Sequence, residues 1–226
     1  VTDANGCSNS SSVLVEPIIC CQPNNNEHVW TNETITSNDF HSTNITINGD
    51  VILDGDFTFW GCVIELAPNA SLILDQDDKS FIGTTFTNCM DYVWKEIKIL
   101  ECNNSFVEFN ECTIEYSING IVNESSRKTD IIGNQFINNY EQSIYISDWQ
   151  SSSSDLNIKS NIIKHMINDY VNPYIGYRPK IGILLMNNNL NGSHLNIGFG
   201  NTFKELYNGI YSISSDAIIF NNLFEN

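Results

Sequence analysis

The chain has 226 residues and a formal net charge of -17, yet only 16% of its residues are charged. This excess of carboxylates argues against nucleic acid and anionic membranes as partners. No segment is long and apolar enough for membrane insertion, and none has the pattern of a signal peptide. We therefore expect a solvated exterior made mostly of Asn, Ser and Thr side chains.

The first 17 residues have the composition of the end of a β module. The stretch VTDANGC, ending at Cys7, is followed by serines and by VLVEP, ending at Pro17. It resembles the last strands of the immunoglobulin-like repeats of large adhesins, gliding-motility adhesins among them, that Bacteroidota export to the cell surface by type IX secretion. The resemblance implies a secreted or surface-attached protein. The alternative is an ordinary turn at Asn5 and Gly6, which any β protein could contain.

Residues 18–26 have the composition of a linker, which places a domain boundary near residue 24. We therefore predict the end of an immunoglobulin-like repeat over residues 1–24 and a second domain over residues 25–226. The chain opens in mid-pattern and stops inside a repeat, so we interpret it as a piece of a longer protein.

Seven cysteines leave at least one without a disulfide partner. Cys7 could pair with Cys20 or Cys21. Cys62 and Cys89 each follow a phenylalanine by three residues, so they could stack in adjacent coils as a disulfide or as packed thiols. We expect Cys112 to be a buried thiol rather than a nucleophile.

Residues 30–100 hold short β-branched and aromatic runs parted by turns, typical of strands. The runs are residues 45–47, 51–53, 63–66, 72–74 and 97–99. Residues 66–72, 86–89 and 94–97 resemble the entry coils of secreted parallel β-helix proteins of the pectate-lyase-like superfamily. Where that family usually has glycine after Trp-x, this chain has Glu96, which is a departure from the pattern.

Residues 106–226 repeat one phrase, in which a fixed slot is followed two residues later by a large apolar residue. The unit is about 22 residues with insertions, and such a period indicates stacked supersecondary units. Asparagine suits the slot because it tolerates a left-handed backbone and its amide can bond the next coil. The slots of this structural ladder are Cys112, Asn134, Asn161, Asn201 and Asn222, with Thr84 as an earlier copy.

A unit this short accommodates three strands and three turns, with each strand pairing to the next coil. We therefore predict an all-β fold, a right-handed parallel β-helix (solenoid) preceded by the tail of the immunoglobulin-like repeat. An Asn-rich β-sandwich with accidental spacing is the alternative.

Catalytic residues are not apparent in the sequence. His28, His41, His165 and His194 are scattered, and Arg178 with Lys180 lacks the aspartate cluster that polygalacturonase-like members of the superfamily carry. We expect His165 to lie on the surface beside a strand. Calcium, which pectate lyases use, could bind one of two aspartate groups, but each group also has the spacing of a solvated turn. The groups are Asp50, Asp54 and Asp56, and Asp75, Asp77 and Asp78. We assign no metal site and no cofactor.

The longest interruption of the repeat, residues 169–180, is rich in tyrosine. Long loops on a rigid scaffold are often functional, and aromatic rings beside amides suit sugars or protein partners. We predict that ligand binding, if present, uses exposed Tyr170, Tyr174, Tyr177 and Arg178, with Trp149 from a neighbouring bulge beside them. The alternative is that these rings cover the flank of the helix.

The leading hypothesis is therefore a non-catalytic structural and adhesive segment of a large exported cell-surface protein, acting as a rigid spacer with a glycan or protein ligand. A polysaccharide lyase or glycoside hydrolase is the rival. A third hypothesis is a subunit of a surface filament, because open coil ends favour association with another copy or with neighbouring repeats.

Overall fold

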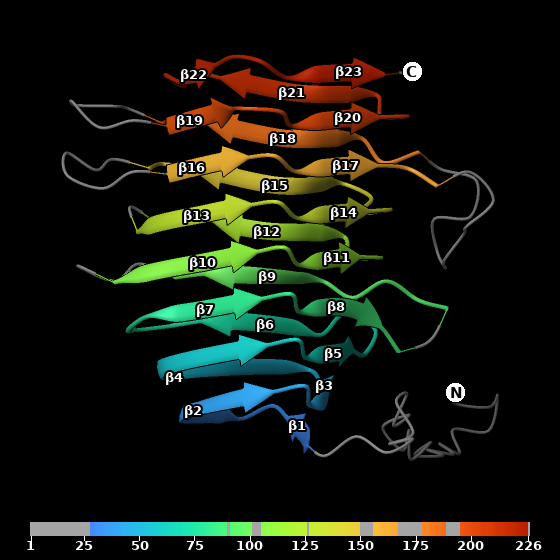
Figure 1. The fold of residues 1–226 in the computed structure, drawn as a ribbon. Helices are drawn as coiled ribbons and strands as arrows, with labels where there is room; N and C mark the ends of the chain where they lie inside the picture. The colour runs from blue at the N-terminus through green and yellow to red at the C-terminus, as the bar shows by residue number, and fades with distance from the viewer. Residues whose placement is uncertain are drawn as a thin grey trace, which may run out of the picture.

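The computed structural model describes residues 28–89, 91–100, 105–125, 127–149, 156–166, 178–188 and 195–225. These residues form 23 β-strands (Figure 1), and no helix among them is long and apolar enough to cross a membrane. The predictions for residues 1–24, including the immunoglobulin-like tail and the pairing of Cys7, lie outside the described residues.

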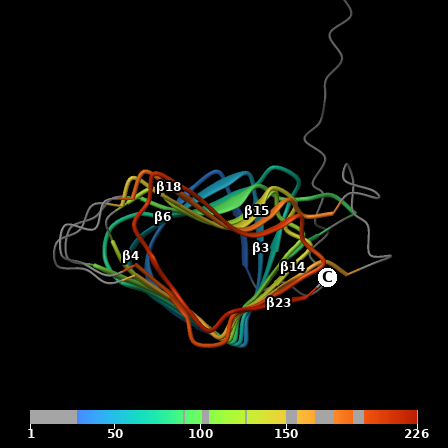
Figure 2. The ribbon, with the colours of Figure 1, turned by 90° about the horizontal axis from the view of Figure 1, so that it is seen from above.

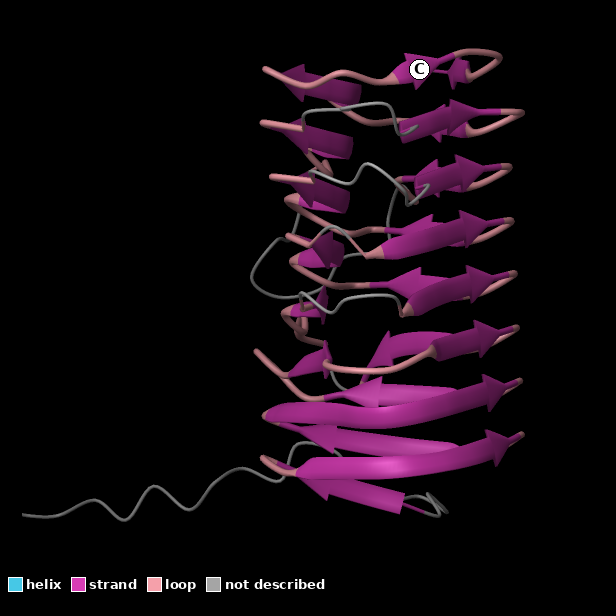
Figure 3. Ribbon diagram, turned by 90° about the vertical axis from the view of Figure 1, so that its left-hand side faces the viewer, coloured by secondary structure: helices cyan, strands magenta, loops and turns pink. Residues whose placement is uncertain are grey.

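The strands form a parallel β-helix, as predicted. Every strand pairing in the described residues is parallel and joins a strand to its equivalent in the next coil. Viewed along the stack, the coils superpose as a three-sided outline (Figure 2), and from the side the strands lie one above another (Figure 3). We call the three sides faces A, B and C, in the order in which a coil visits them from β2 onward.

Each face contains one strand or half-strand from each coil. Face A comprises the first halves of β2 (Thr34–His41) and β4 (Asp50–Trp60), then β6 (Ser71–Leu74), β9 (Glu96–Ile99), β12 (Asn119–Asn123), β15 (Gln142–Ser147), β18 (Ile181–Met186) and β21 (Asn208–Ile213). Face B comprises the second halves of β2 and β4, then β7 (Lys79–Ile82), β10 (Phe106–Asn110), β13 (Lys128–Ile132), β16 (Leu156–Lys159), β19 (Leu195–Gly198) and β22 (Ile218–Ile219). Face C comprises β1 (His28–Thr31), β3 (Asn44–Asn48), β5 (Val63–Leu66), β8 (Thr85–Asn88), β11 (Thr113–Glu115), β14 (Gln135–Ile137), β17 (Ile162–Lys164), β20 (Thr202–Lys204) and β23 (Leu223–Glu225).

The interior is one continuous core, because side chains alternate inward and outward along each strand. On face B, one inward position is phenylalanine in four successive coils and isoleucine in the coils above. In register these residues are Phe40, Phe59, Phe81, Phe109, Ile131, Ile158, Ile197 and Ile219. The four phenylalanine rings are stacked, with centroids 4.9–5.2 Å apart between neighbours. We call this set the interior row.

The predicted slot lies at the corner between faces B and C, immediately before each face C strand. Its residues, which we call the corner ladder, are Thr43, Cys62, Thr84, Cys112, Asn134, Asn161, Asn201 and Asn222. From Cys62 onward each side chain donates a hydrogen bond to the interior-row carbonyl of the coil before. The fold thereby contains the predicted asparagine stack, and Thr84 occupies the slot of its coil.

The asparagines of the corner ladder also bond one another. Asn161 Oδ1 accepts from Asn134 N and Nδ2 at 2.9 and 3.0 Å, and Asn201 Oδ1 accepts equally from Asn161. Asn222 Oδ1 continues the series by accepting from Asn201 Nδ2 at 2.9 Å. Each of these amides therefore ties its coil to the one before it through both its donor and its acceptor.

One predicted reason for asparagine at the slot is wrong. The left-handed backbone belongs to the residue before the slot, not to the slot itself. This preceding position has positive φ in all eight coils and is Ser42, Gly61, Gly83, Glu111, Gly133, Ser160, Gly200 and Asn221. Asparagine is therefore favoured in the slot by its hydrogen bonds, while the turn is made by its neighbour.

The core is uncovered at the C-terminal end of the described residues. Ile219 and Phe224 continue inward positions of the coils below, yet they are 46% and 57% exposed. Their in-register partners Ile197 and Phe203 are 0% and 2% exposed. At the other end, Trp30 and Phe40 are 5% and 6% exposed, so the two ends of the stack differ.

Candidate binding surface

The exterior of face A carries a nearly continuous row of apolar side chains. Parallel in-register pairing aligns one outward position of seven successive strands, from β4 to β21. We call these residues the face A row: Ile52, Ile73, Lys98, Val122, Tyr145, Leu184 and Tyr211. Most are half-buried, as expected where each side chain packs against the ones above and below, whereas Val122 is only 3% exposed and Tyr211 is 47% exposed. Lys98 is the only charged member.

A second outward position on face A adds apolar area next to the row. Met186 pairs in register with Ile213, which is 39% exposed, and Tyr145 Oη lies 3.6 Å from Met186 Sδ. On the other side of the row, amides bond along the stack, with Gln142 Nε2 donating to Asn119 Oδ1 at 2.8 Å. Face A therefore presents an apolar centre with a polar rim.

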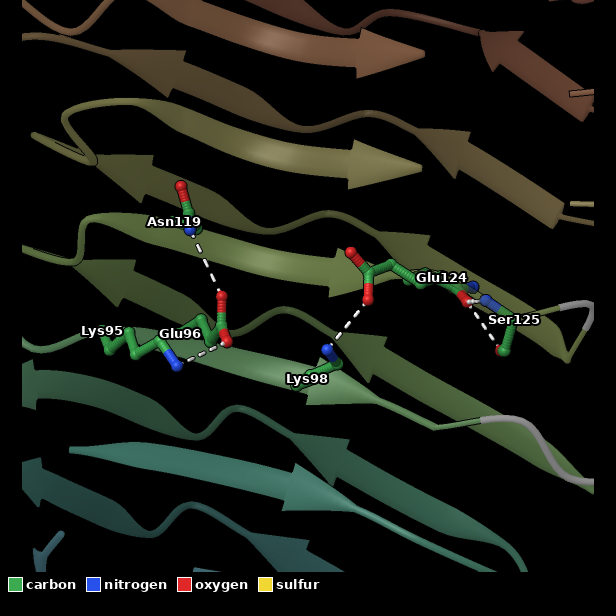
Figure 4. Close-up of polar contacts among 7 residues, drawn as sticks. Lys95, Glu96, Lys98, Asn119, Glu124 and Ser125 are labelled. Carbon is green, nitrogen blue, oxygen red and sulfur yellow. Dashed lines mark hydrogen bonds and ion pairs between the residues drawn. The ribbon is translucent and has the colours of Figure 1, made fainter. Parts of the chain in front are cut away.

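The charges around the face A row are balanced and paired between β9 and β18, whereas Asp50 and Asp54 flank Ile52 on β4. Residues 95–100, 118–124, 141–147 and 180–186 contain three lysines and three glutamates. Their nitrogen-to-oxygen distances are 3.3 Å for Lys95 with Glu96, 2.8 Å for Lys98 with Glu124 and 2.6 Å for Lys180 with Glu141. Figure 4 shows the first two pairs, with Asn119 Nδ2 also 3.2 Å from Glu96. The hydrogen bond from Lys98 to Glu124 raises the pKa of Lys98.

Face B has a mixed exterior, in which a polar column lies next to a column that contains Trp60, Ile82 and Ile132. One outward column runs through Ser80, Glu108, Asp130, Asn157 and Asn196. Ser80 Oγ donates to Glu108 Oε2 at 3.1 Å, and Asn157 Nδ2 donates to Asp130 Oδ1 at 2.7 Å. Glu108 and Asp130 are direct neighbours on adjacent strands, a carboxylate pair that inspection of the sequence did not detect.

Face C also carries charged and hydroxyl side chains on its exterior. Thr87 Oγ1 donates to Glu115 Oε1 at 2.8 Å, and Lys204 Nζ lies 2.6 Å from Glu225. Of the three exteriors, face A is therefore the one whose central column is apolar in most coils.

The predicted ligand-binding loop is described only in part. Tyr170, Tyr174 and Tyr177 lie outside the described residues, so their predicted exposure stays a prediction. The side chain of Arg178 is 48% exposed, and its guanidinium lies 3.0 Å from the Glu205 carboxylate.

Two side chains that were expected at the surface are buried. Trp149 is 0% exposed and belongs to the core, so the prediction that it lies exposed beside the tyrosines is wrong. It follows β15, at the corner between faces A and B, whereas Arg178 precedes β18, at the corner between faces C and A. The described residues next to the two interruptions therefore lie at different corners of the helix. His165 is only 8% exposed, and its Nδ1 lies 2.9 Å from Asn138 Oδ1.

The turn at residues 75–77 encloses a cationic side chain. Lys79 is fully buried, and its ammonium donates to the carbonyls of Asp75 (3.1 Å), Gln76 and Asp77 (3.2 Å). Arg127, 1% exposed, donates to the Asp75 carbonyl at 2.9 Å. Burial, with a smaller contribution from Arg127, lowers the pKa of Lys79 from 10.5 to about 8.

This arrangement leaves little support for calcium at the second aspartate group. The inward carbonyls bind an ammonium, and Asp78 Oδ1 accepts a hydrogen bond from Phe106 N at 2.7 Å. In the first group, Asp56 Oδ1 accepts from Asp78 N at 3.0 Å. No cluster of three or more His, Cys, Asp or Glu side chains within the described residues has a metal-binding arrangement. Calcium binding stays an untested alternative.

The cysteines divide into two kinds. Cys62 and Cys112 are buried thiols of the corner ladder, whereas Cys89 is disulfide-bonded. The suggested pairing of Cys62 with Cys89 is therefore wrong, and the two are not stacked, because Cys89 follows β8 whereas Cys62 precedes β5. Burial raises the pKa of Cys112 to about 12, which suits a packed thiol rather than a nucleophile.

No protein-family model, curated protein or solved structure matches the chain.

Proposed function

We propose that the chain is a stiff, non-catalytic spacer segment of a large exported cell-surface protein of the adhesin type. The observation that carries the proposal is the continuity of the stack, in which in-register strand pairing on three faces surrounds one core and a buried corner ladder. Bending such a stack would break hydrogen bonds on one face while compressing another. A spacer that holds a ligand-binding end away from a surface needs this property.

Export is supported by two features. Cys89 is disulfide-bonded, and structural disulfides persist mainly in oxidising compartments. The resemblance of the first 17 residues to adhesin repeats points the same way. Melting temperatures measured with and without a reducing agent test this part. If the disulfide stabilises the exported form, the melting temperature should fall on reduction.

The non-catalytic part is tested by incubating the chain with neutral and acidic polysaccharides, with and without calcium. We expect neither unsaturated uronate nor new reducing ends. If protein of verified purity releases either product steadily, the chain is an enzyme, and the proposal of a non-catalytic spacer is wrong.

A glycoside hydrolase is the second candidate because Glu108 and Asp130 are adjacent carboxylates on face B. Hydrolases use a carboxylate pair separated by about 5 to 10 Å. If hydrolysis is detected, the Glu108→Gln variant should abolish it. Glu65→Gln on face C serves as the matched control.

A binding role for residues 169–180 is tested on glycan arrays. The double variant Tyr174→Ala, Tyr177→Ala should lose binding at a nearly unchanged melting temperature, because affinity concentrates in a few aromatic anchors. Tyr92→Ala, at a tyrosine that is 48% exposed elsewhere, is the control. A strong fall in the melting temperature of the double variant would show that the tyrosines stabilise the fold. The chain would then have no ligand-binding site in this loop.

A further inference from the structure

The face A row has the composition of a protein interface. It joins tyrosine with aliphatic side chains, and Met186 and Ile213 extend it on one side. Interface cores are enriched in tyrosine and methionine and depleted in charged residues, and Lys98 is the one charged member of the row. A sugar-binding face would instead rely mainly on aromatic rings, and the row contains four aliphatic residues for its two tyrosines. The chemistry therefore favours a protein sheet over a glycan as the occupant.

Charge then selects the partner. Two copies of a chain with net charge -17 repel each other over most of their surface. Between β9 and β18, face A carries three lysines and three glutamates, all in the ion pairs described above. A second copy can therefore approach the part of the face between β9 and β18 without meeting a net charge of the same sign, whereas Asp50 and Asp54 add two carboxylates at the β4 end.

The shape of the face also suits its own copy. A two-fold axis that lies in the contact plane, parallel to the face, places the apolar row of one copy over that of the other, as a self-complementary contact requires. Two β-sheets pack face to face about 10 Å apart when both present apolar side chains. Because in-register pairing already orders the row, little side-chain freedom is lost on contact.

We propose that face A is a self-association surface through which two copies of this chain pair side by side, with the face A row of one packed on that of the other. This inference goes beyond the spacer role and does not depend on it. On a cell surface it would bundle neighbouring spacers laterally.

The size of the row predicts how strong the contact is. Seven strands about 4.8 Å apart and about five residues of 3.3 Å give a footprint of roughly 450 Å² for each copy. Standard stable interfaces bury about 800 Å² per partner. The dimer is therefore weak and dependent on concentration, and it becomes populated where anchoring raises the local concentration.

Sedimentation velocity of the full chain, from low micromolar to near-millimolar concentration, tests the proposal. We expect a concentration-dependent monomer–dimer equilibrium that added salt strengthens, because salt screens the repulsion between acidic chains. A contact driven by charge attraction would instead weaken with salt, and that result would contradict the proposal.

Leu184→Lys on face A is the decisive variant. It should raise the dimer dissociation constant about tenfold or more, because it places a charge within the apolar contact, between Tyr145 and Tyr211. Since lysine reduces the net negative charge, the loss would not come from stronger long-range repulsion between the acidic chains. Tyr211→Lys, at a side chain that is 47% exposed, is a second variant with less risk to folding. The matched control is Ile82→Lys on the exterior of face B, which should leave the dissociation constant unchanged.

Three results would overturn the proposal. The chain could remain monomeric at every concentration, in which case face A serves a different partner. Both face A variants could retain the parental equilibrium while remaining folded by circular dichroism. Finally, Ile219→Lys could abolish association while the face A variants do not, which would place the contact at the uncovered end of the stack.

Discussion

The lower and upper coils of this helix are joined by different chemistry at the same corner. In the lower coils the corner ladder consists of threonine and cysteine, and the interior row is a stack of phenylalanines from Phe40 to Phe109. In the upper coils, from Asn134 onward, the ladder is asparagine and the interior row is isoleucine. Both halves keep the same backbone register and the same bond to the preceding interior-row carbonyl.

The difference shows that the corner needs a donor rather than a particular residue. A thiol or hydroxyl makes one bond to the coil before, and the phenylalanine rings add apolar contact between coils. An amide makes that bond and also accepts from the coil before, while the interior row is filled by smaller side chains. We infer that the lower coils are held mainly by packing and the upper coils more by hydrogen bonds.

The largest expected effect is in the phenylalanine stack. Phe81→Ala should lower the free energy of unfolding by about 4 kcal/mol, because it leaves a cavity and removes two stacked neighbours and one edge contact. This loss is measured by chemical denaturation, and the slope of the unfolding free energy against denaturant concentration should be the same in the variant and the parent. Ile158→Ala, at the equivalent position of the upper coils, is the comparison, and a larger loss there than at Phe81 would contradict the assignment of packing to the lower coils.

The next effect concerns the asparagines. Asn161→Ala should lower the free energy of unfolding by about 3 kcal/mol, because Asn134 N and the Ile131 carbonyl lose their bonds to this side chain inside the core. Hydrogen exchange at Asn134 N should accelerate in the same variant. An unchanged exchange rate at this amide would show that the ladder contributes little to the upper coils.

Cys112→Ala should cost less, about 1 kcal/mol, because it removes only weak bonds from Sγ, to the carbonyls of Phe81 and Asn110. Comparing the loss of unfolding free energy in Asn161→Ala with that in Cys112→Ala measures how the upper and lower halves of the corner ladder differ. Equal losses would show that the two halves contribute equally to stability.

The last expected effect is the contribution of Lys79, in the lower coils, to the pH dependence of stability. Its pKa is lowered in the folded state, so the unfolded chain binds more protons between pH about 8 and 10.5. Stability from this group should therefore rise with pH across that window. Lys79→Met should remove this rise, whereas Lys128→Met, at an exposed lysine, should leave it. A rise that persists in Lys79→Met would assign it to other groups.

Much of the fold was accessible from the sequence because the corner repeats in chemistry as well as in spacing. Asn134, Asn161 and Asn201 stand in equivalent local phrases, and the β-branched runs before and after them indicate short strands. The lower slots Thr43 and Cys62 were missed because a hydroxyl and a thiol replace the amide. The left-handed position was missed because glycine, serine, glutamate and asparagine all occupy it.

The exterior was less accessible for a geometrical reason. The face A row depends on which residues align between coils, and insertions of unequal length separate Val122, Tyr145 and Leu184 in the sequence. The same insertions hide the burial of Trp149, which looks like part of a polar bulge but belongs to the core. The face A row and the burial of Trp149 both depend on the register between coils, which is known only once the strand pairing is known.

The central claim is stiffness, and single-molecule extension between handles at Val29 and Leu223, both exposed, tests it most directly. We predict no lengthening until a first rupture, followed by unequal steps of about 65 to 135 Å, the extended lengths of the 19 to 40 residues between successive corner-ladder positions. Gradual lengthening before the first rupture would show that the coils flex against one another, which would contradict the spacer.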